Sequence, residues 1–428
     1  MRNGNQIELL PIDDAHLEHD WTFNGVSTRE LTHCYHDYPA RMIPQVASKI
    51  LDKFGDRAKT LLDPYCGTGT SLVEGLIRGI NVIGSDLNPT ARMIAQAKTT
   101  EVDVEELDRE IARIKRNINK PNKKIDIEKA SEIDIRNLDF WFKQYVIEDL
   151  LFLRNQIDLV KDEGVKLFLR VVFSETVRES SNTRKTEFKL YRYAEDVLKE
   201  HKPQPFDIFI KKVERNRKGL MRFLDSLKSL NRRPTAAIYD LNTMESIPEN
   251  KIAPESVDIV VTSPPYGDSR TTVAYGQYTR LSAAWLGFND GGKVDSSLMG
   301  GTVYKEIPKF KSKKLNSAIT KIKKVDEKRA KEIASFYIDL YKSIENVTKV
   351  VRKGGYTCYV VGNRRVKGVE LPTDDAIKSF FEFCEFTHVY TFTRSIPNKR
   401  MPAKNSPSNV AGKLDATMSK EYIVVMKK

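Results

Sequence analysis

Residues 61–79 read LLDPYCGTGTSLVEGLIRG. Two leucines and an aspartate precede two closely spaced glycines and then an apolar pattern with helical spacing, which predicts a strand, a tight turn and a helix in succession. Gly67 and Gly69 would let the backbone of the turn approach a bound molecule closely at the carboxyl end of the strand. The third glycine of a dinucleotide-binding loop and the Lys-Ser/Thr pair of a P-loop are both missing. The stretch therefore predicts an α/β sheet with a ligand-binding turn of another kind.

Strand-like and helix-like patterns alternate on both sides of this stretch. The strand-like runs cover residues 58–64, 80–86, 236–240, 257–266 and 355–363, and the helical patterns cover 41–54, 71–79, 89–98 and 331–352. Such alternation predicts an α/β fold with a mostly parallel sheet. Two closing runs, 386–394 and 421–428, are expected to pair antiparallel at one edge of the sheet.

The alternation stops between about residue 101 and residue 235. Apolar residues with helical spacing recur there, at Leu150, Leu151, Leu153, Ile157 and Leu159. The stretch is too long for a loop of a compact domain and predicts an inserted, mainly helical domain at 101–235. Residues 1–100 and 236–428 are then the two parts of one α/β domain.

Positive charge is concentrated in three segments. The chain of 428 residues has 71 Lys and Arg against 58 Asp and Glu, a net charge of +13. Residues 178–233 carry +8, residues 301–330 carry +7 and residues 391–413 carry +5, so the rest of the chain is net −7. This is the pattern of a nucleic-acid binder, although solvated helix faces would also produce it. The lysine- and glycine-containing residues 287–325 are expected to form a mobile basic loop.

Composition narrows the class of protein further. With 40% hydrophobic and 30% charged residues, the chain is typical of a soluble globular protein. Its aliphatic runs are far shorter than the roughly 20 residues of a membrane span, and we expect no membrane association. Four cysteines and no secretion-signal pattern favour the reducing cytoplasm.

Two aspartates follow strand-like runs. Asp86 comes about 20 residues after the glycine turn, where a carboxylate can accept hydrogen bonds from both hydroxyls of a ribose. Asp240 ends the next run, where an adenine amino group would be in reach. Both could instead cap helices, and Cys66 in the turn could be a small packed residue.

Residues 32–40 also contain chemically suggestive side chains. His33, Cys34 and His36 could be metal ligands, but no second Cys/His pair completes a site. We therefore predict no metal centre.

Residues 257–268, VDIVVTSPPYGD, hold the most specific pattern in the chain. Two prolines fix the backbone and donate no N–H, so the carbonyl groups of this corner are free acceptors. The Ser263 oxygen and a proline carbonyl could accept both protons of an exocyclic amino group and direct its lone pair at an electrophile. Tyr266 could stack on a flipped base. A simple strand-ending turn is the alternative.

The motifs DPYCGTGT, GSD and TSPPY together resemble those of the amino-group DNA methyltransferases, and Ser before Pro-Pro-Tyr resembles the cytosine-N4 branch. The resemblance spans residues 28–100 and 236–428. It implies a Rossmann-like class I methyltransferase sheet, with S-adenosylmethionine as cofactor and double-stranded DNA as substrate. It also implies a restriction–modification system with a cognate endonuclease.

The resemblance assigns roles to individual residues. It implies a cofactor site at Tyr38, Pro39, Ala40, Asp63, Cys66, Gly67, Gly69, Asp86 and Asp240, and a catalytic corner at Ser263, Pro264, Pro265 and Tyr266. Methyl transfer would be direct, because the cofactor carries its own leaving group. Cytosine-C5 methylation would need a cysteine nucleophile in the catalytic loop, which is missing. Adenine-N6 methylation, methylation of an RNA base, and a catalytically silent DNA-binding subunit stay open.

Basic residues interleaved with aromatic ones indicate where DNA would bind. The predicted DNA contacts are Arg178, Asn182, Arg184, Lys185, Lys189, Arg192, Tyr275, Tyr278, Arg280, Lys399 and Arg400. An exposed helix end or a solvated loop would explain parts of the same pattern. Leu281, Trp285 and Leu286 are expected to pack a helix instead. Glu187-Phe188-Lys189 fits a short nuclease motif that arises often by chance, so we predict no nuclease.

Overall fold

The computed structural model describes residues 21–121, 123, 125–185, 189–267, 275–288, 294–396, 404–405, 415–416 and 418–428. Its centre is a seven-stranded sheet in the order β3-β2-β1-β4-β5-β11-β8. The strands are β1 (Thr60–Asp63), β2 (Asn81–Ser85), β3 (Ala236–Tyr239), β4 (Val257–Thr262), β5 (Val351–Val361), β8 (Thr387–Ser395) and β11 (Lys420–Lys427). Two short pairs, β6 (Arg365–Val366) with β7 (Val369–Glu370) and β9 (Lys404–Asn405) with β10 (Asp415–Ala416), lie outside it.

Strand order explains where a ligand can bind. Strands β1 to β5 are parallel, while β11 pairs antiparallel with both β5 and β8. The order reverses between β1 and β4, which opens a crevice at the carboxyl ends of these two strands. The expected Rossmann-like methyltransferase sheet is confirmed, as is the antiparallel pairing of the two closing strands.

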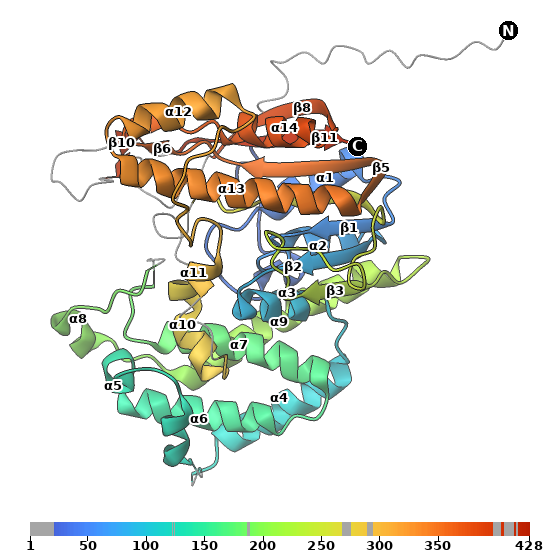
Figure 1. Ribbon diagram of the computed structural model, residues 1–428. Coiled ribbons are helices and arrows are strands. Elements are labelled where there is room, and N and C mark those ends of the chain that lie inside the picture. Colours follow the sequence, from blue (N-terminus) through green and yellow to red (C-terminus); the bar gives the residue numbers. More distant parts are fainter. Residues whose placement is uncertain are drawn as a thin grey trace.

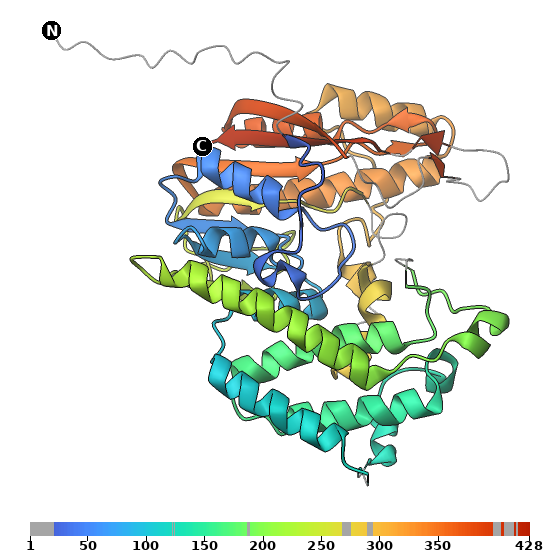
Figure 2. The same cartoon turned by 180° about the vertical axis from the view of Figure 1, so that it is seen from behind.

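Helices cover both faces of the sheet (Figures 1 and 2). On one face lie α12 (Lys313–Lys323), α13 (Glu327–Val350) and α14 (Thr373–Phe383); on the other lie α1 (Pro44–Phe54) and α2 (Thr70–Leu76). Successive residues of β4 serve the two cores, since Val260 packs with α13 whereas Ile259 and Val261 pack with α1 and α2. This two-sided burial explains why three successive residues of β4, 259–261, are all apolar.

The remaining helices form a second layer below the sheet in Figure 1. They are α4 (Val104–Ile118), α5 (Leu138–Trp141), α6 (Gln144–Asp158), α7 (Glu163–Ser180), α8 (Glu195–Glu200) and α9 (Pro205–Lys228), with the 3-10 turns η3 (Leu31–Cys34) and η4 (Ile127–Glu132). Their core continues into α3 (Pro89–Thr99) and α10 (Tyr275–Trp285), where Leu281, Trp285 and Leu286 are buried as expected. The division of the chain into one α/β domain (1–100 and 236–428) and one inserted helical domain (101–235) stays a prediction.

The basic segment 287–325 differs from the expected loop. It contains α11 (Val294–Ser297) and the eleven-residue helix α12. Leu315, Ala318, Ile319 and Ile322 are buried against α13 and α14, and their spacing is that of one helix face. The lysines around them obscured this pattern in the sequence. Within the described residues, none of the helices combines the length and apolar character that a bilayer crossing requires.

Candidate active site

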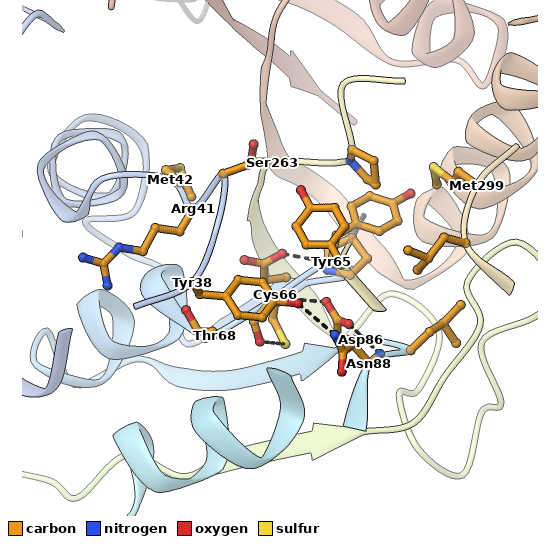
Figure 3. A pocket seen from close by; sticks show the side chains of 18 of the residues that line it. Tyr38, Arg41, Met42, Tyr65, Cys66, Thr68, Asp86, Asn88, Ser263 and Met299 are labelled. Carbon is orange, nitrogen blue, oxygen red and sulfur yellow. Dashed lines mark hydrogen bonds between the residues drawn. The ribbon is translucent and has the colours of Figure 1, made fainter. Parts of the chain in front are cut away.

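A cleft of about 930 Å³, including its opening to solvent, lies at the carboxyl ends of β1, β2 and β4. The cleft lies at the reversal point of the sheet, where ligands of α/β folds bind. Of the residues with an expected cofactor or catalytic role, it is lined by Tyr38, Pro39, Ala40, Asp63, Cys66, Gly67, Asp86, Ser263 and Pro265. The structure therefore brings the glycine turn and the Ser-Pro-Pro corner to one cavity (Figure 3).

Asp63 ends β1 beneath the turn and is only 3% exposed. Its carboxylate accepts hydrogen bonds from Ser71 Oγ, from Thr262 Oγ1 at 2.5 Å and from the Tyr65 backbone N–H at 3.1 Å. Burial raises the pKa of Asp63 to about 6, against the opposing effect of these donors. Asp63 thus ties the turn after β1 to α2 and to β4.

The turn itself is held against β2. Gly67 and Gly69 both adopt positive φ, at 50° and 76°. The Gly67 N–H donates to Asp86 Oδ2 at 3.0 Å, and the Asn88 N–H donates to Asp86 Oδ1 at 2.8 Å. Burial raises the pKa of Asp86 despite these hydrogen bonds. A carboxylate with remaining lone pairs therefore faces the cavity directly beside the glycine backbone.

Three tyrosines close the side of the cleft near Asp86. Tyr38 stacks on Tyr275 with ring centroids 5.8 Å apart and meets Tyr278 edge-on at 5.9 Å. The Asn88 side chain donates to the Tyr38 hydroxyl at 3.0 Å, and Figure 3 shows this hydroxyl next to Asp86. Burial raises the pKa of Tyr38 well above its ordinary value, so its hydroxyl keeps its proton. Tyr275 lines the cavity, and its contact with DNA stays a prediction.

The catalytic corner follows β4 directly. Ser263 and Pro265 line the cavity, whereas Pro264 is buried and Tyr266 is half-buried outside the lining. Ser263 Oγ donates to the Tyr266 hydroxyl at 3.3 Å, and that hydroxyl donates to Glu421 Oε1 at 2.9 Å. Glu421 lies on β11 and belongs to no motif seen in the sequence.

Gly69 and Asp240 lie outside the cavity lining. Gly69 precedes α2, where a Cβ would come 3.1 Å from the Ala95 Cβ, so its role is close packing of the turn on α3. The two carboxylate oxygens of Asp240 accept hydrogen bonds from Nη1 and Nη2 of Arg92, at 2.9 and 2.8 Å. The cap expected as the alternative role of Asp240 is thus replaced by a bidentate ion pair.

The residues expected to contact DNA fall into three groups. Arg178, Asn182 and Tyr278 are buried; the Arg178 guanidinium lies 3.6 Å from the Tyr278 ring centroid, and this packing argues against direct DNA contact in this conformation. Arg184, Lys185, Lys189 and Arg280 are exposed, and Arg192 is half-buried over the Phe140 ring. Lys399 and Arg400 lie outside the described residues.

A buried lysine behind the cavity wall was not predicted from the sequence. Lys98 is fully buried, and its Nζ lies 3.3 Å from Thr68 Oγ1, which lines the cavity. Burial lowers the pKa of Lys98 well below its ordinary value, and nearby Arg41 lowers it further. The Arg41 guanidinium turns away from the cavity in Figure 3 and donates to the His33 carbonyl at 2.9 Å. A lysine in a helix carries no sequence signal of such burial.

The histidines near the N-terminus serve structural contacts. His33 Nε2 lies 3.0 Å from Glu74 Oε1, and His36 Nε2 lies 3.2 Å from Ser174 Oγ. Desolvation lowers the pKa of both rings, that of His36 to about 4. Over the part of the chain that the structure describes, no three His, Cys, Asp or Glu side chains come together as metal ligands would.

The sequence is similar to those of known proteins. The chain is 41% identical over 426 residues to the type II methyltransferase M.MvaI of Kocuria varians, which covers 95% of this chain and 93% of that protein. It is 24% identical over 320 residues to the type II methyltransferase M.BsoBI of Geobacillus stearothermophilus, covering 67% of this chain and 60% of that one. No family model matches the sequence.

A solved structure overlays the chain only loosely. The rRNA methyltransferase aviRa from Streptomyces viridochromogenes gives a TM-score of 0.34 at 10% sequence identity, over 92% of this chain and 88% of that one. Because this score is low, the fold assignment rests on the strand order.

Proposed function

The chain belongs to the type II DNA methyltransferases, and from that premise we propose that it transfers a methyl group from S-adenosylmethionine to the exocyclic N4 of cytosine in double-stranded DNA. The observation that carries the proposal is the shared cavity. Ser263, the residue that distinguishes a cytosine-N4 type of corner, lines the same cleft as the glycine turn and Asp86. The recognised site would be protected from a cognate endonuclease of the same restriction–modification system.

The cofactor would lie along the carboxyl ends of β1 and β2. Asp86 would accept hydrogen bonds from the ribose hydroxyls, beside the Gly67 backbone, where a glycine leaves room for close approach. The side of the cleft near Tyr38 and Thr68, with Lys98 behind Thr68, would take the polar amino-acid end of the cofactor. When bound, S-adenosylmethionine supplies a methyl group on a sulfonium, which is already a good leaving group.

The protein would then have to position the cytosine and direct the lone pair of its amino nitrogen at the methyl group. Ser263 Oγ and a proline carbonyl of the corner would each accept one amino proton of a cytosine turned out of the duplex, which leaves the nitrogen lone pair free. Two proline rings hold this corner rigid, so little reorganisation accompanies the reaction. The exposed Arg184, Lys185, Lys189 and Arg280 would contact DNA phosphates.

Methyl transfer to mixed-sequence duplex DNA, followed by mass spectrometry of the released nucleosides, tests the proposal. We expect N4-methylcytosine. N6-methyladenine as the sole product would overturn the assignment of Ser263 while leaving the family membership intact. No methylated nucleoside, together with no binding of S-adenosylmethionine in calorimetry, would remove the proposed activity altogether.

A further inference from the structure

The catalytic corner is hydrogen-bonded to a strand far away in the sequence. Ser263 Oγ contacts the Tyr266 hydroxyl, and this hydroxyl contacts Glu421 Oε1 on β11, 155 positions after Tyr266. The other oxygen of Glu421, Oε2, lies 3.3 Å from Arg394 Nη1. Glu421 and Arg394 are direct cross-strand partners of β11 and β8, and their side chains are only 16% and 5% exposed.

The chemistry of the three side chains fixes the direction of each of these hydrogen bonds. A carboxylate can only accept, so the Tyr266 hydroxyl must donate its proton to Glu421. The Tyr266 oxygen is then an acceptor for the single hydroxyl proton of Ser263. Burial and the charge of Glu421 raise the pKa of Tyr266 well above its ordinary value, so the phenol keeps the proton it donates.

The direction of the hydrogen bond from Ser263 to Tyr266 matters for the amino group that would be methylated. With its proton committed to Tyr266, Ser263 Oγ has only lone pairs to offer to the cavity. A serine hydroxyl free to rotate could donate its proton to the amino nitrogen and occupy the lone pair that must attack the methyl group. A serine locked as an acceptor binds an amino proton and leaves that lone pair available.

We propose that Glu421, paired with Arg394, is a positioning residue that fixes Ser263 as a hydrogen-bond acceptor through Tyr266. The inference rests on the proposed function and deepens it, because it gives a catalytic purpose to a cross-strand ion pair outside all sequence motifs. The structural alternative is that Glu421 and Arg394 only hold β8 against β11. An ion pair of that kind would affect folding but not the turnover of folded enzyme.

A double-mutant cycle on the full chain separates these two roles. Tyr266→Phe removes only the relaying hydroxyl. Glu421→Gln replaces a carboxylate, which can only accept, with an amide that can also donate, and it breaks the ion pair with Arg394. We expect each variant to lower kcat about 10- to 100-fold, the range for losing one hydrogen bond to a charged group. The KM for DNA and the dissociation constant for S-adenosylmethionine should stay unchanged. The double variant should be no slower than the worse single variant, because both changes interrupt one chain.

Multiplicative losses in the double variant would overturn the inference, as would a wild-type kcat in either folded single variant. Tyr266→Phe leaves the Glu421–Arg394 pair in place, so it tests the inference even if Glu421→Gln fails to fold. Glu382→Gln is the matched control, since Glu382 forms an exposed pair with Lys378 on α14. The product formed by the wild type is identified separately, so failure of the proposed function shows in the nucleoside and failure of this inference shows in the cycle.

Discussion

The two sides of the cavity are built in different ways. On the cofactor side, Asp63, Gly67 and Asp86 come from one short stretch of chain and are linked through the turn between β1 and α2. On the catalytic side, Ser263 is oriented through Tyr266 by Glu421, which lies on a strand from the other end of the chain. On the proposed function, cofactor binding would therefore depend on a local motif, whereas the chemical step would depend on the completed sheet.

The largest effect should come from the catalytic side. Ser263→Ala removes the oxygen that would accept an amino proton, and we expect kcat to fall about 100- to 1,000-fold. Binding of S-adenosylmethionine in calorimetry should stay unchanged, since Asp86 and the glycine turn are untouched. Ser226→Ala is the matched control, at a half-buried site on α9 where the hydroxyl donates to the Arg222 carbonyl. Loss of cofactor binding in Ser263→Ala would mean that the two sides are not independent.

The cofactor side should show the opposite pattern. Asp86→Ala removes the proposed acceptor for two ribose hydroxyls, at a cost of about 3 kcal/mol, or roughly 100-fold in the dissociation constant of S-adenosylmethionine. The turnover at saturating cofactor should change far less. Asp225→Ala, at an exposed site on α9, serves as the control. Equal losses in binding and turnover would contradict the separation of the cavity into a cofactor side and a catalytic side.

The pH dependence of stability tests one long-range contact of the cofactor side, that between His36 and Ser174. His36, two residues before Tyr38, is buried against Ser174 of α7, and desolvation lowers its pKa to about 4 from 6.5. The unfolded chain therefore binds this proton more readily, and stability present above pH 6.5 is lost as the pH falls towards 4. The loss amounts to roughly 3 kcal/mol.

Urea unfolding at pH 7.5, 5.5 and 4.5 measures this loss. We expect His36→Asn to be less stable than the wild type at pH 7.5 but to lose less stability on acidification. His388→Asn, on β8, is the control, because His388 is only half-buried. Parallel pH curves for His36→Asn and the wild type would show that another group causes the acid sensitivity. Asp63, with its raised pKa of about 6, acts in the opposite direction and is common to all three proteins.

The smallest effects distinguish the two glycines of the turn. Gly67 has φ of 50° and open space where a Cβ would lie, so Gly67→Ala should cost only the backbone strain of about 1 kcal/mol. Gly69 has φ of 76° and would also place a Cβ 3.1 Å from the Ala95 Cβ, so Gly69→Ala should cost about 2 kcal/mol. Thermal unfolding of the two variants measures the difference. Equal costs would show that α3 yields to the added methyl group.

The same contrast explains what could be predicted from the sequence. The glycine turn, Asp86 and the strand ends were predictable because periodicity and turn residues act over a few positions. The Ser-Pro-Pro-Tyr corner was found for the same reason. Glu421 could not be found, because its partner Arg394 is its neighbour only across two paired strands.

Burial was the other property hidden from sequence reasoning. Arg178 and Asn182 have the composition of a DNA-contacting surface, yet both are buried between helices. Lys98 likewise looks like a solvated helix residue but is fully buried behind the cavity. Whether a polar side chain of a helix faces solvent depends on what packs over it. The local pattern cannot supply that.

The place of β11 in the sheet has a consequence for synthesis of the protein. This strand is inserted between β5 and β8, although both of those strands leave the ribosome earlier. A growing chain that has not passed Glu421 can already form the turn around Asp86, but it has no carboxylate with which to orient Ser263. Nascent chains should therefore bind cofactor before they can methylate DNA.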